Sequence, residues 1–460
     1  MSNLQISLAK HNIKLLFFFI VIVLFSSASL IATNAAFLFT DNIYNGVVVG
    51  TIPVGGLSVD EAKDAIIASF KETITKPIIT LSNQNETWSI PSQDIEISIN
   101  ADDLAKQAYQ VGRRGNIINM LKERYLAVNG GYTVPFTQNY NYDKLHALLI
   151  TIAKSVDRAP KNASIVYNNN VINIIPEEWG QQVDLPTSLA DITSKLNRGI
   201  PFSSELTVTK QPPSIVSQDF TDIDNLIAVY TTEFNPNNTN RFQNVAIASE
   251  SINKILIRPG TTFSFNKSVG LRLPEYGYKE APVLVDGKLL LDWGGGVCQV
   301  STTLYNAVLL ADMEIIERTS HFIPPSYVPL GQDAAVADNL LDFRFKNISP
   351  YNIYIISETI NNQITVSIFG KRVANAAEIR IEATSKSLGY STIIKQDSSL
   401  PLGREIIESS GQKGFEVTTY RVKMTNGKEI SRENLSSDEF KPEDRVIRVG
   451  TKQQSQQSSK

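Results

Sequence analysis

The sequence predicts an α+β protein of several domains, and three observations support this fold class. Short β-branched runs bounded by Gly, Pro and Asn alternate with segments of helical periodicity along most of the chain. The 460 residues are enough for about two to four domains of ordinary size. The hydrophobic content of 42% is sufficient to bury the cores of such domains.

Near the N-terminus lies one long apolar segment, residues 15–38, which has no charged residue. A run of this length can cross a bilayer as a helix. Lys10 and Lys14 precede it and Asp41 is the first charge after it, so we expect the N-terminus in the cytoplasm. The bulk of the chain would then be extracytoplasmic, behind a single-pass signal anchor in the cell membrane. Small residues at 32–36 leave a cleaved signal peptide as the alternative.

Two stretches repeat one pattern, residues 77–115 and 163–199. Each contains a strand, a polar turn, a second strand that ends in Ile-Pro, and a capped helix that ends in Arg-Gly. A further helix at residues 59–70 is predicted before them, because Ser58 and Glu61 have the spacing of a capping box. We therefore predict two similar α+β units that serve as a scaffold or bind a ligand such as glycan or peptide.

The central region should combine helices with short strands. A helical pattern follows Asp219, a second helix is expected at residues 241–253, and Asp286-Gly287 is a hairpin signal. Strands are predicted at 314–317, 343–345, 353–357 and 364–368. Further strands at 378–382, 416–424 and 445–449 indicate a small all-β domain, followed by a polar tail that we expect to be disordered.

The only cysteine, Cys298, follows three glycines and begins a helical pattern. Apolar residues recur on one face of that helix, at Val300, Leu304, Ala307, Val308 and Ala311. Unpaired N–H groups and the partial positive charge at a helix start favour a thiolate. A buried structural cysteine is the alternative interpretation, since free cysteines are often buried.

As an enzyme, the chain would use Cys298 as the nucleophile, His321 as the base and Asp333 to orient the imidazole. Asp338 and Asp342 are alternatives to Asp333. The backbone before the cysteine would supply donors for an oxyanion. The predicted substrate-binding residues are Gly294, Gly295, Gly296 and Gln299.

Composition argues against several other classes of function. The formal net charge of −3 and the pI of about 5.8 give no basic domain for nucleic acid. A single cysteine excludes an intramolecular disulfide and a zinc–thiolate site. Because His11, His146 and His321 lie far apart in the sequence, we expect no metal and no cofactor.

Residues 241–347 contain a series of long motifs, which are RFQNV, PGTTFSFN, GGGVCQVSTTLYNAVL, ERTSHF, YVPLGQDAAV and DFRFKN. Together these motifs resemble the VanW-like family. The motifs VGGLSVDEA, RAPKNA and EEWGQQVD resemble the peptidoglycan-binding (YoaR-like) units that often precede that domain, and RVIRVGT is similar to the end of the five-glycine extracellular domain. The order Cys, His, Asp is similar in outline to transglutaminase-like and papain-like folds, with shorter gaps here.

This resemblance implies a bacterial envelope protein with a cell-wall context, and the family name refers to vancomycin-resistance gene clusters. It does not imply a reaction, so whether the chain is an enzyme stays open. The expected function is a membrane-anchored, extracytoplasmic protein that binds or modifies peptidoglycan, with cell-wall peptide or glycan as partner. The alternatives are a thiol-dependent acyl-transferase or hydrolase acting on cell-wall peptide, and an accessory protein that recruits wall-synthesis enzymes.

The expected domains follow from these observations. They are a cytoplasmic N-terminus at 1–14, a transmembrane anchor at 15–38, repeated peptidoglycan-binding units at 42–215, a VanW-like domain at 219–370, a five-glycine-type β domain at 378–451 and a disordered tail at 452–460.

Overall fold

The computed structural model describes most of the chain after the N-terminal region. The described residues are 17–23, 40–84, 86–285, 288–374 and 376–452. The expected membrane segment falls mostly outside these ranges, although residues 17–23 within it are helical. Among the described helices, none is both long and apolar enough to cross a membrane. The predicted hairpin turn at Asp286-Gly287 and nearly all of the predicted tail also lie outside the described residues.

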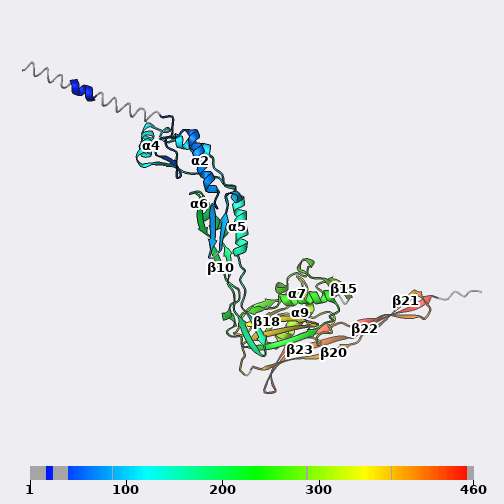
Figure 1. The fold of residues 1–460 in the computed structure, drawn as a ribbon. Coiled ribbons are helices and arrows are strands. Elements are labelled where there is room, and N and C mark those ends of the chain that lie inside the picture. The colour runs from blue at the N-terminus through cyan, green and yellow to red at the C-terminus, as the bar shows by residue number, and fades with distance from the viewer. Residues whose placement is uncertain (1–16, 24–39, 85, 286–287, 375, 453–460) are drawn as a thin grey trace, which may run out of the picture. The chain divides into compact units, whose positions relative to one another are not determined.

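The described chain divides into two compact units (Figure 1). The first comprises Met1–Pro160 and Trp179–Pro212, and the second comprises Lys161–Glu178 and Pro213–Lys460. Each is a mixture of helices and small sheets, and the last part of the second unit is all β. The predicted α+β class is therefore confirmed for the described residues, while the membrane helix stays a prediction.

In the first unit, helices pack against short sheets. The sheets have the strand orders β2-β1-β5, β4-β3-β9 and β10-β8. Its strands are β1 (Val47–Val49), β2 (Ile52–Pro53), β3 (Ile79–Asn83), β4 (Glu86–Ile90), β5 (Tyr132–Val134), β8 (Gly180–Val183), β9 (Phe202–Glu205) and β10 (Val208–Gln211). Its helices are α2 (Val59–Ile74), α3 (Ala101–Gln110), α4 (Ile117–Gly130), α5 (Tyr142–Val156) and α6 (Leu185–Leu196), with a short 3-10 turn at Ser92–Ile95.

Helix α2 begins where the sequence predicts. The Ser58 hydroxyl accepts the Glu61 N–H at 3.3 Å, and the Glu61 carboxylate accepts the Ser58 N–H at 2.9 Å. This reciprocal capping box satisfies two of the N–H groups that a helix start leaves unpaired. Ala62 and Ile66 are the buried residues of the helix, and α2 continues to Ile74, beyond the predicted end at residue 70.

The two predicted repeats share local elements but pack differently. In the first copy, the β3–β4 hairpin is joined by the parallel strand β9. In the second copy, the hairpin β6 (Ser164–Asn168) and β7 (Val171–Ile175) belongs to the second compact unit, whereas helix α6 belongs to the first. The hairpin-and-helix pattern is thus present twice, although the second copy is divided between the two units.

An antiparallel sheet with the order β11-β19-β18-β12 forms the centre of the second unit. Its strands are β11 (Asn225–Glu233), β12 (Ile255–Ile257), β18 (Ile353–Ile360) and β19 (Gln363–Gly370). The helix predicted after Asp219 is wrong, because this segment contains a short 3-10 turn and then β11. Strand β11 pairs with β19 along its length, and that tertiary pairing overrides the local helical pattern.

Helices α7 (Thr239–Ser251) and α9 (Val297–Leu310) contact each other and this sheet. Helix α9 was expected to bury one face, yet every residue from Gln299 to Leu309 is buried. Its buried polar side chains form hydrogen bonds within the protein. For example, the hydroxyl groups of Thr303 and Thr232 are hydrogen-bonded at 2.7 Å. Helix α9 is therefore the central helix of the unit's main core.

Smaller elements complete the second unit. They are β13 (Thr262–Ser264), α8 (Phe265–Val269), β14 (Glu280–Val285), β15 (Lys288–Trp293), β16 (Glu314–Glu317) and β17 (Arg344–Lys346), with short 3-10 turns at Ser217–Phe220 and Pro274–Tyr276. Strands β14 and β15 pair as the predicted hairpin, and β16 and β17 lie where strands were predicted.

The C-terminal β region has two three-stranded sheets, β20-β23-β24 and β21-β25-β22. Its strands are β20 (Glu378–Leu388), β21 (Thr392–Pro401), β22 (Glu405–Gln412), β23 (Gly414–Thr425), β24 (Lys428–Phe440) and β25 (Glu443–Lys452). Three of them match predicted strands, and β21, β22 and β24 were not predicted. Ile381 and Leu435 of this region pack against the main core of the unit.

Candidate active site

The glycine loop that precedes Cys298 has a backbone that requires glycine. Gly294 and Gly296 have φ values of 77° and 112°, which side chains disfavour. At Gly295, a Cβ would lie 2.6 Å from the carbonyl oxygen of Ala281. The loop brings the chain from β15 directly into the first turn of α9, where Cys298 is the second residue.

Cys298 is a half-buried residue, and its sulfur lies against the backbone of Val336. The thiol reaches the Val336 carbonyl oxygen at 3.3 Å, and the Val336 N–H points to the sulfur at 3.5 Å. The N–H groups of Val297 and Gln299 are occupied by carbonyls of the glycine loop. Among the described residues, no hydrogen bond uses the Cys298 N–H, so this donor is available to an oxyanion.

His321 lies between Cys298 and Asp333. Its Nδ1 is 2.6 Å from Oδ2 of Asp333, and its backbone N–H also donates to that oxygen at 2.6 Å. The imidazole is hydrogen-bonded to the Cys298 side chain as well. Because Nδ1 is held by the carboxylate, Nε2 is the ring nitrogen that remains for the Cys298 side chain. The predicted order of Cys298, His321 and Asp333 is thus one hydrogen-bonded chain.

Asp333 is itself held by a buried guanidinium. Arg318 lies 2.9 Å from Asp333 and 2.6 Å from Asp438, and all three side chains are at most 9% exposed. Asp438 belongs to β24, so the C-terminal β region contributes directly to the support of the site. Arg318 also lies over the ring of Tyr305 in α9, at 5.6 Å from the centroid.

The protonation states of the site favour an ion pair. Burial disfavours the Cys298 thiolate, but the hydrogen bond and charge of His321 outweigh burial and lower the pKa of the thiol. Burial likewise opposes the imidazolium, yet the hydrogen bonds to Asp333 and Cys298 raise the pKa of His321 to about 9. Burial would raise the pKa of Asp333, and the contacts with His321 and Arg318 lower it. The site therefore favours the thiolate of Cys298 and the imidazolium of His321 over the neutral pair.

The two alternative carboxylates are occupied elsewhere. Asp338 forms an ion pair with Arg272 and accepts its backbone N–H at 3.1 Å. Asp342 accepts the Ser264 hydroxyl at 2.6 Å and the Asn266 N–H at 2.9 Å. Asp333 is the one of the three candidates that contacts His321.

The predicted substrate-binding residues flank Cys298 in the sequence, but the side chain of Gln299 is buried in the protein. Its side chain is 1% exposed, and its amide nitrogen donates to the Thr232 hydroxyl and the Glu233 carbonyl. Its amide oxygen accepts a 2.9 Å hydrogen bond from Arg241. Direct contact of Gln299 or the glycines with a substrate stays a prediction.

Sequence reasoning missed several side chains at the site. Arg241, Tyr327, Arg318 and Asp438 were not assigned roles, although three of them lie in motifs that carry the resemblance. Tyr327 is hydrogen-bonded to Thr302 of α9, and burial together with the nearby Cys298 charge raises its pKa. Asp438 could not be found locally, since it comes from another strand region. No cluster of metal-ligating side chains occurs in the part of the chain that the structure describes.

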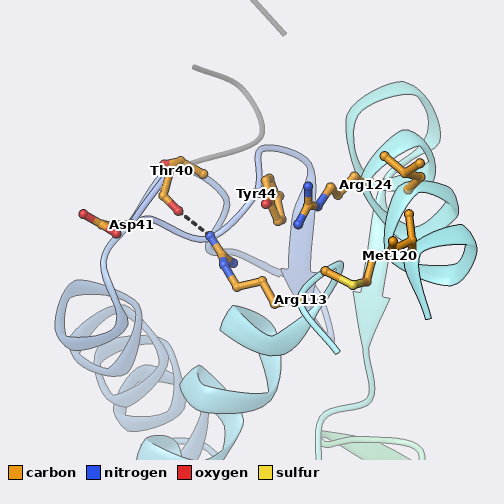
Figure 2. A pocket seen from close by; sticks show the side chains of 8 residues that line it. Thr40, Asp41, Tyr44, Arg113, Met120 and Arg124 are labelled. Atoms are coloured by element: carbon orange, nitrogen blue, oxygen red, sulfur yellow. Dashed lines mark hydrogen bonds between the residues drawn. The ribbon is translucent and has the colours of Figure 1, made fainter. Parts of the chain in front are cut away.

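A pocket of about 500 Å³ lies in the first unit, close to where the described chain resumes at Thr40 (Figure 2). Arg113 donates to the carbonyl oxygens of Thr40 at 2.8 Å and Asn42 at 2.6 Å. Its guanidinium lies 4.3 Å from the ring centroid of Tyr44. The pocket is lined by Thr40, Asp41, Tyr44, Arg113, Ile117, Met120, Leu121 and Arg124. The Arg113 side chain thus holds the backbone at Thr40 and Asn42 in place.

Three family models match successive parts of the chain. The VanW like protein model matches residues 240–369, which include Cys298, His321 and Asp333. A peptidoglycan binding domain model matches residues 88–202. The G5 domain model matches residues 380–452, the region that supplies Asp438.

Two curated relatives are similar over large parts of their own length. The uncharacterized protein YoaR of Bacillus subtilis is 31% identical over 244 residues, covering 53% of this chain and 80% of YoaR. The vancomycin B-type resistance protein VanW of Enterococcus faecalis is 26% identical over 181 residues, covering 37% of this chain and 66% of VanW. A solved IgA1 protease G5 domain is 26% identical and covers 16% of this chain and 90% of that structure, with a TM-score of 0.15.

Proposed function

Because this chain belongs to the VanW-like family, we propose that it is a membrane-anchored, extracytoplasmic protein that cleaves or transfers acyl groups of cell-wall peptide at Cys298. The observation that carries the proposal is the hydrogen-bonded chain of Cys298, His321 and Asp333. Its thiol pKa is lowered and its imidazole pKa is raised to about 9. A buried structural cysteine needs neither a charged partner nor an oriented imidazole.

The reaction would begin when the Cys298 thiolate adds to a substrate carbonyl carbon. A C–S bond forms, and the carbonyl π pair moves to oxygen, where the free Cys298 N–H stabilises the negative charge. Collapse breaks the C–N bond, and the leaving nitrogen takes a proton from His321. The product of this half-reaction is a thioester on Cys298 and a free amine.

The second half-reaction would release the acyl group. Water or an acceptor amine adds to the thioester while His321 takes its proton. The C–S bond then breaks and regenerates the thiolate, which gives a carboxylic acid with water and a new amide with an amine. Asp333 keeps the imidazole oriented throughout, through its 2.6 Å contact with Nδ1.

The surroundings of the site suit an extended ligand. Trp293, just before the glycine loop, is 39% exposed, and Phe322, next to His321, is 51% exposed. Exposed aromatic side chains next to a reactive group are common contacts for peptides and glycans. The match of residues 88–202 to a peptidoglycan binding domain supports delivery to the cell wall, and the apolar segment at 15–38 supports anchoring to the membrane.

The experiment is incubation of the full-length protein with purified peptidoglycan, followed by mass spectrometry of the muropeptides. New cleaved or cross-linked products are expected with the wild type and not with Cys298→Ser or His321→Ala. His146→Ala is the matched control, since His146 lies in the first unit, stacked on Tyr142. Products that persist in Cys298→Ser would refute the proposal.

Binding without catalysis is the second candidate, and the peptidoglycan binding match favours it. In that case the wild type and Cys298→Ser would sediment equally with peptidoglycan and leave the muropeptide profile unchanged. The two measurements together separate an enzyme from a wall-binding protein.

A further inference from the structure

Arg241 is a cation beside the candidate nucleophile without a carboxylate partner. It lies in the first turn of α7, where its backbone N–H donates to Asn238 at 3.0 Å. No ion pair of Arg241 occurs among the described residues, and its Nη2 has one hydrogen bond, to Gln299 at 2.9 Å. No other side-chain hydrogen bond of Arg241 is formed within the described chain.

The other two guanidiniums near the site are neutralised. Arg318 pairs with Asp333 and Asp438, and Arg272 pairs with Asp338 and donates to Asn266. Arg241 is only partly exposed, and its burial lowers the pKa of the guanidinium. Arginine still keeps its charge at neutral pH. The acidic groups that act on Arg241 are Tyr327 and Cys298 itself, and neither is a carboxylate. A partly buried guanidinium with no carboxylate partner is costly unless a ligand supplies one.

The structure holds Arg241 close to the sulfur. A Cβ at Gly296 would lie 3.0 Å from the Arg241 Cγ, so the side chain crosses the glycine two residues before Cys298. Its Nη2 ends on Gln299, the residue after Cys298. The side chain therefore lies beside Gly296 and Gln299, which precede and follow Cys298 in the chain.

Gln299 also orients the guanidinium. Because its amide nitrogen is used by Thr232 and Glu233, its amide oxygen is fixed toward Arg241. Gln299 thus accepts a hydrogen bond from one N–H group of the Arg241 guanidinium. The remaining N–H groups of this guanidinium have no protein acceptor among the described residues. A planar fork of free donors matches the two oxygens of a carboxylate.

We propose that Arg241 binds a carboxylate of the substrate next to the bond that Cys298 attacks. The substrate class is then a peptide with a free carboxylate adjacent to the scissile amide, either its C-terminal group or an acidic side chain. Gln299 is a positioning residue that acts through Arg241. This inference rests on the proposed function and adds the chemistry of the group that the site recognises.

The first test compares alkylation of Cys298 by iodoacetate and by iodoacetamide at pH 7 in the full-length protein. Iodoacetate carries a carboxylate where iodoacetamide carries a neutral amide. The ratio of the two alkylation rates therefore reports whether a group near Cys298 binds the carboxylate. Arg241→Gln should lower the iodoacetate rate about tenfold, as expected for loss of a charge-assisted hydrogen bond. The iodoacetamide rate should change less than about twofold. Arg258→Gln, which removes a 53% exposed arginine paired with Asp219, is the control.

The second test does not depend on a reactive thiol. In Cys298→Ala, ligand-observed NMR would measure binding of acetyl-Ala-Ala, its C-terminal amide, and acetyl-Ala-Glu amide. Tighter binding of the first probe identifies a C-terminal carboxylate, and tighter binding of the third identifies an acidic side chain. In the double variant Cys298→Ala with Arg241→Gln, the tighter binding of either carboxylate probe should disappear.

The outcomes separate this inference from the proposed function. A native Cys298 that reacts with neither reagent refutes the thiolate, and the NMR measurement then decides the carboxylate site alone. A rate ratio that Arg241→Gln leaves unchanged, or equal binding of all three probes, overturns the assignment of Arg241.

Discussion

Replacing Asp438 with Asn should destabilise the second compact unit, because it removes a charge opposite a buried guanidinium. Both Asp438 oxygens lie 2.6 Å from Arg318 Nη1, and the two side chains are only 9% and 4% exposed. Breaking a buried pair costs about 3–5 kcal/mol. Since Arg318 keeps its ion pair with Asp333 at 2.9 Å, we expect a smaller loss, about 2–4 kcal/mol in the free energy of unfolding.

Differential scanning calorimetry of the full-length protein would measure this effect. A unit of this size shifts by about 2–4 °C per kcal/mol, so its transition should fall by about 5–15 °C. The control is Glu382→Gln, which breaks a pair with Arg432 at 2.9 Å whose side chains are 47% and 38% exposed. Exposed pairs contribute little, so this variant should melt like the wild type. If Asp438→Asn also melts like the wild type, the Arg318 bridge does not hold the unit together.

Three further predictions concern the site. In His321→Ala, the pH at which Cys298 is alkylated by iodoacetamide at half its maximal rate should rise. Burial then raises the pKa of the thiol without an imidazolium to oppose it. Alkylation rates measured over a range of pH would give this midpoint. Muropeptide release by the wild type should fall as the pH rises through about 9, where His321 loses the proton that the leaving amine needs. Gly296→Ala should lose about 1–3 kcal/mol in urea unfolding, since its Cβ would lie 2.9 Å from Val245 Cγ2. Gly403→Ala, which meets no atom within 4 Å, should lose less; equal losses would contradict the packing argument.

Local signals predicted the elements that carry the candidate site. The glycine loop, the helix start at Cys298 and the strand before His321 all have short-range causes, in turn chemistry, capping and periodicity. Asp333 contacts His321 because it follows a turn that returns the chain to that residue. Its catalytic role and those of Cys298 and His321 stay predictions.

Long-range contacts could not be predicted in the same way. Strand β11 has a sequence that also fits a helix, and its pairing with β19 decides the outcome. Helix α9 carries Thr302, Thr303 and Asn306 on faces that periodicity assigns to solvent, yet each donates a buried hydrogen bond to a backbone carbonyl oxygen. The contribution of Asp438 depends on a contact 120 residues away in the sequence. Such partners leave no local pattern.

The clamp of Arg113 on the carbonyls of Thr40 and Asn42 has a mechanical consequence. If the preceding apolar segment anchors the chain, any tension between membrane and wall enters the first unit at Thr40. Two charge-assisted hydrogen bonds, at 2.8 Å and 2.6 Å, would receive that load before it reaches β1. Strand β1 is paired on both sides, with β2 and with β5, so a pull along it must break two ladders together. In an anchored protein, the start of this unit would therefore resist extraction under force.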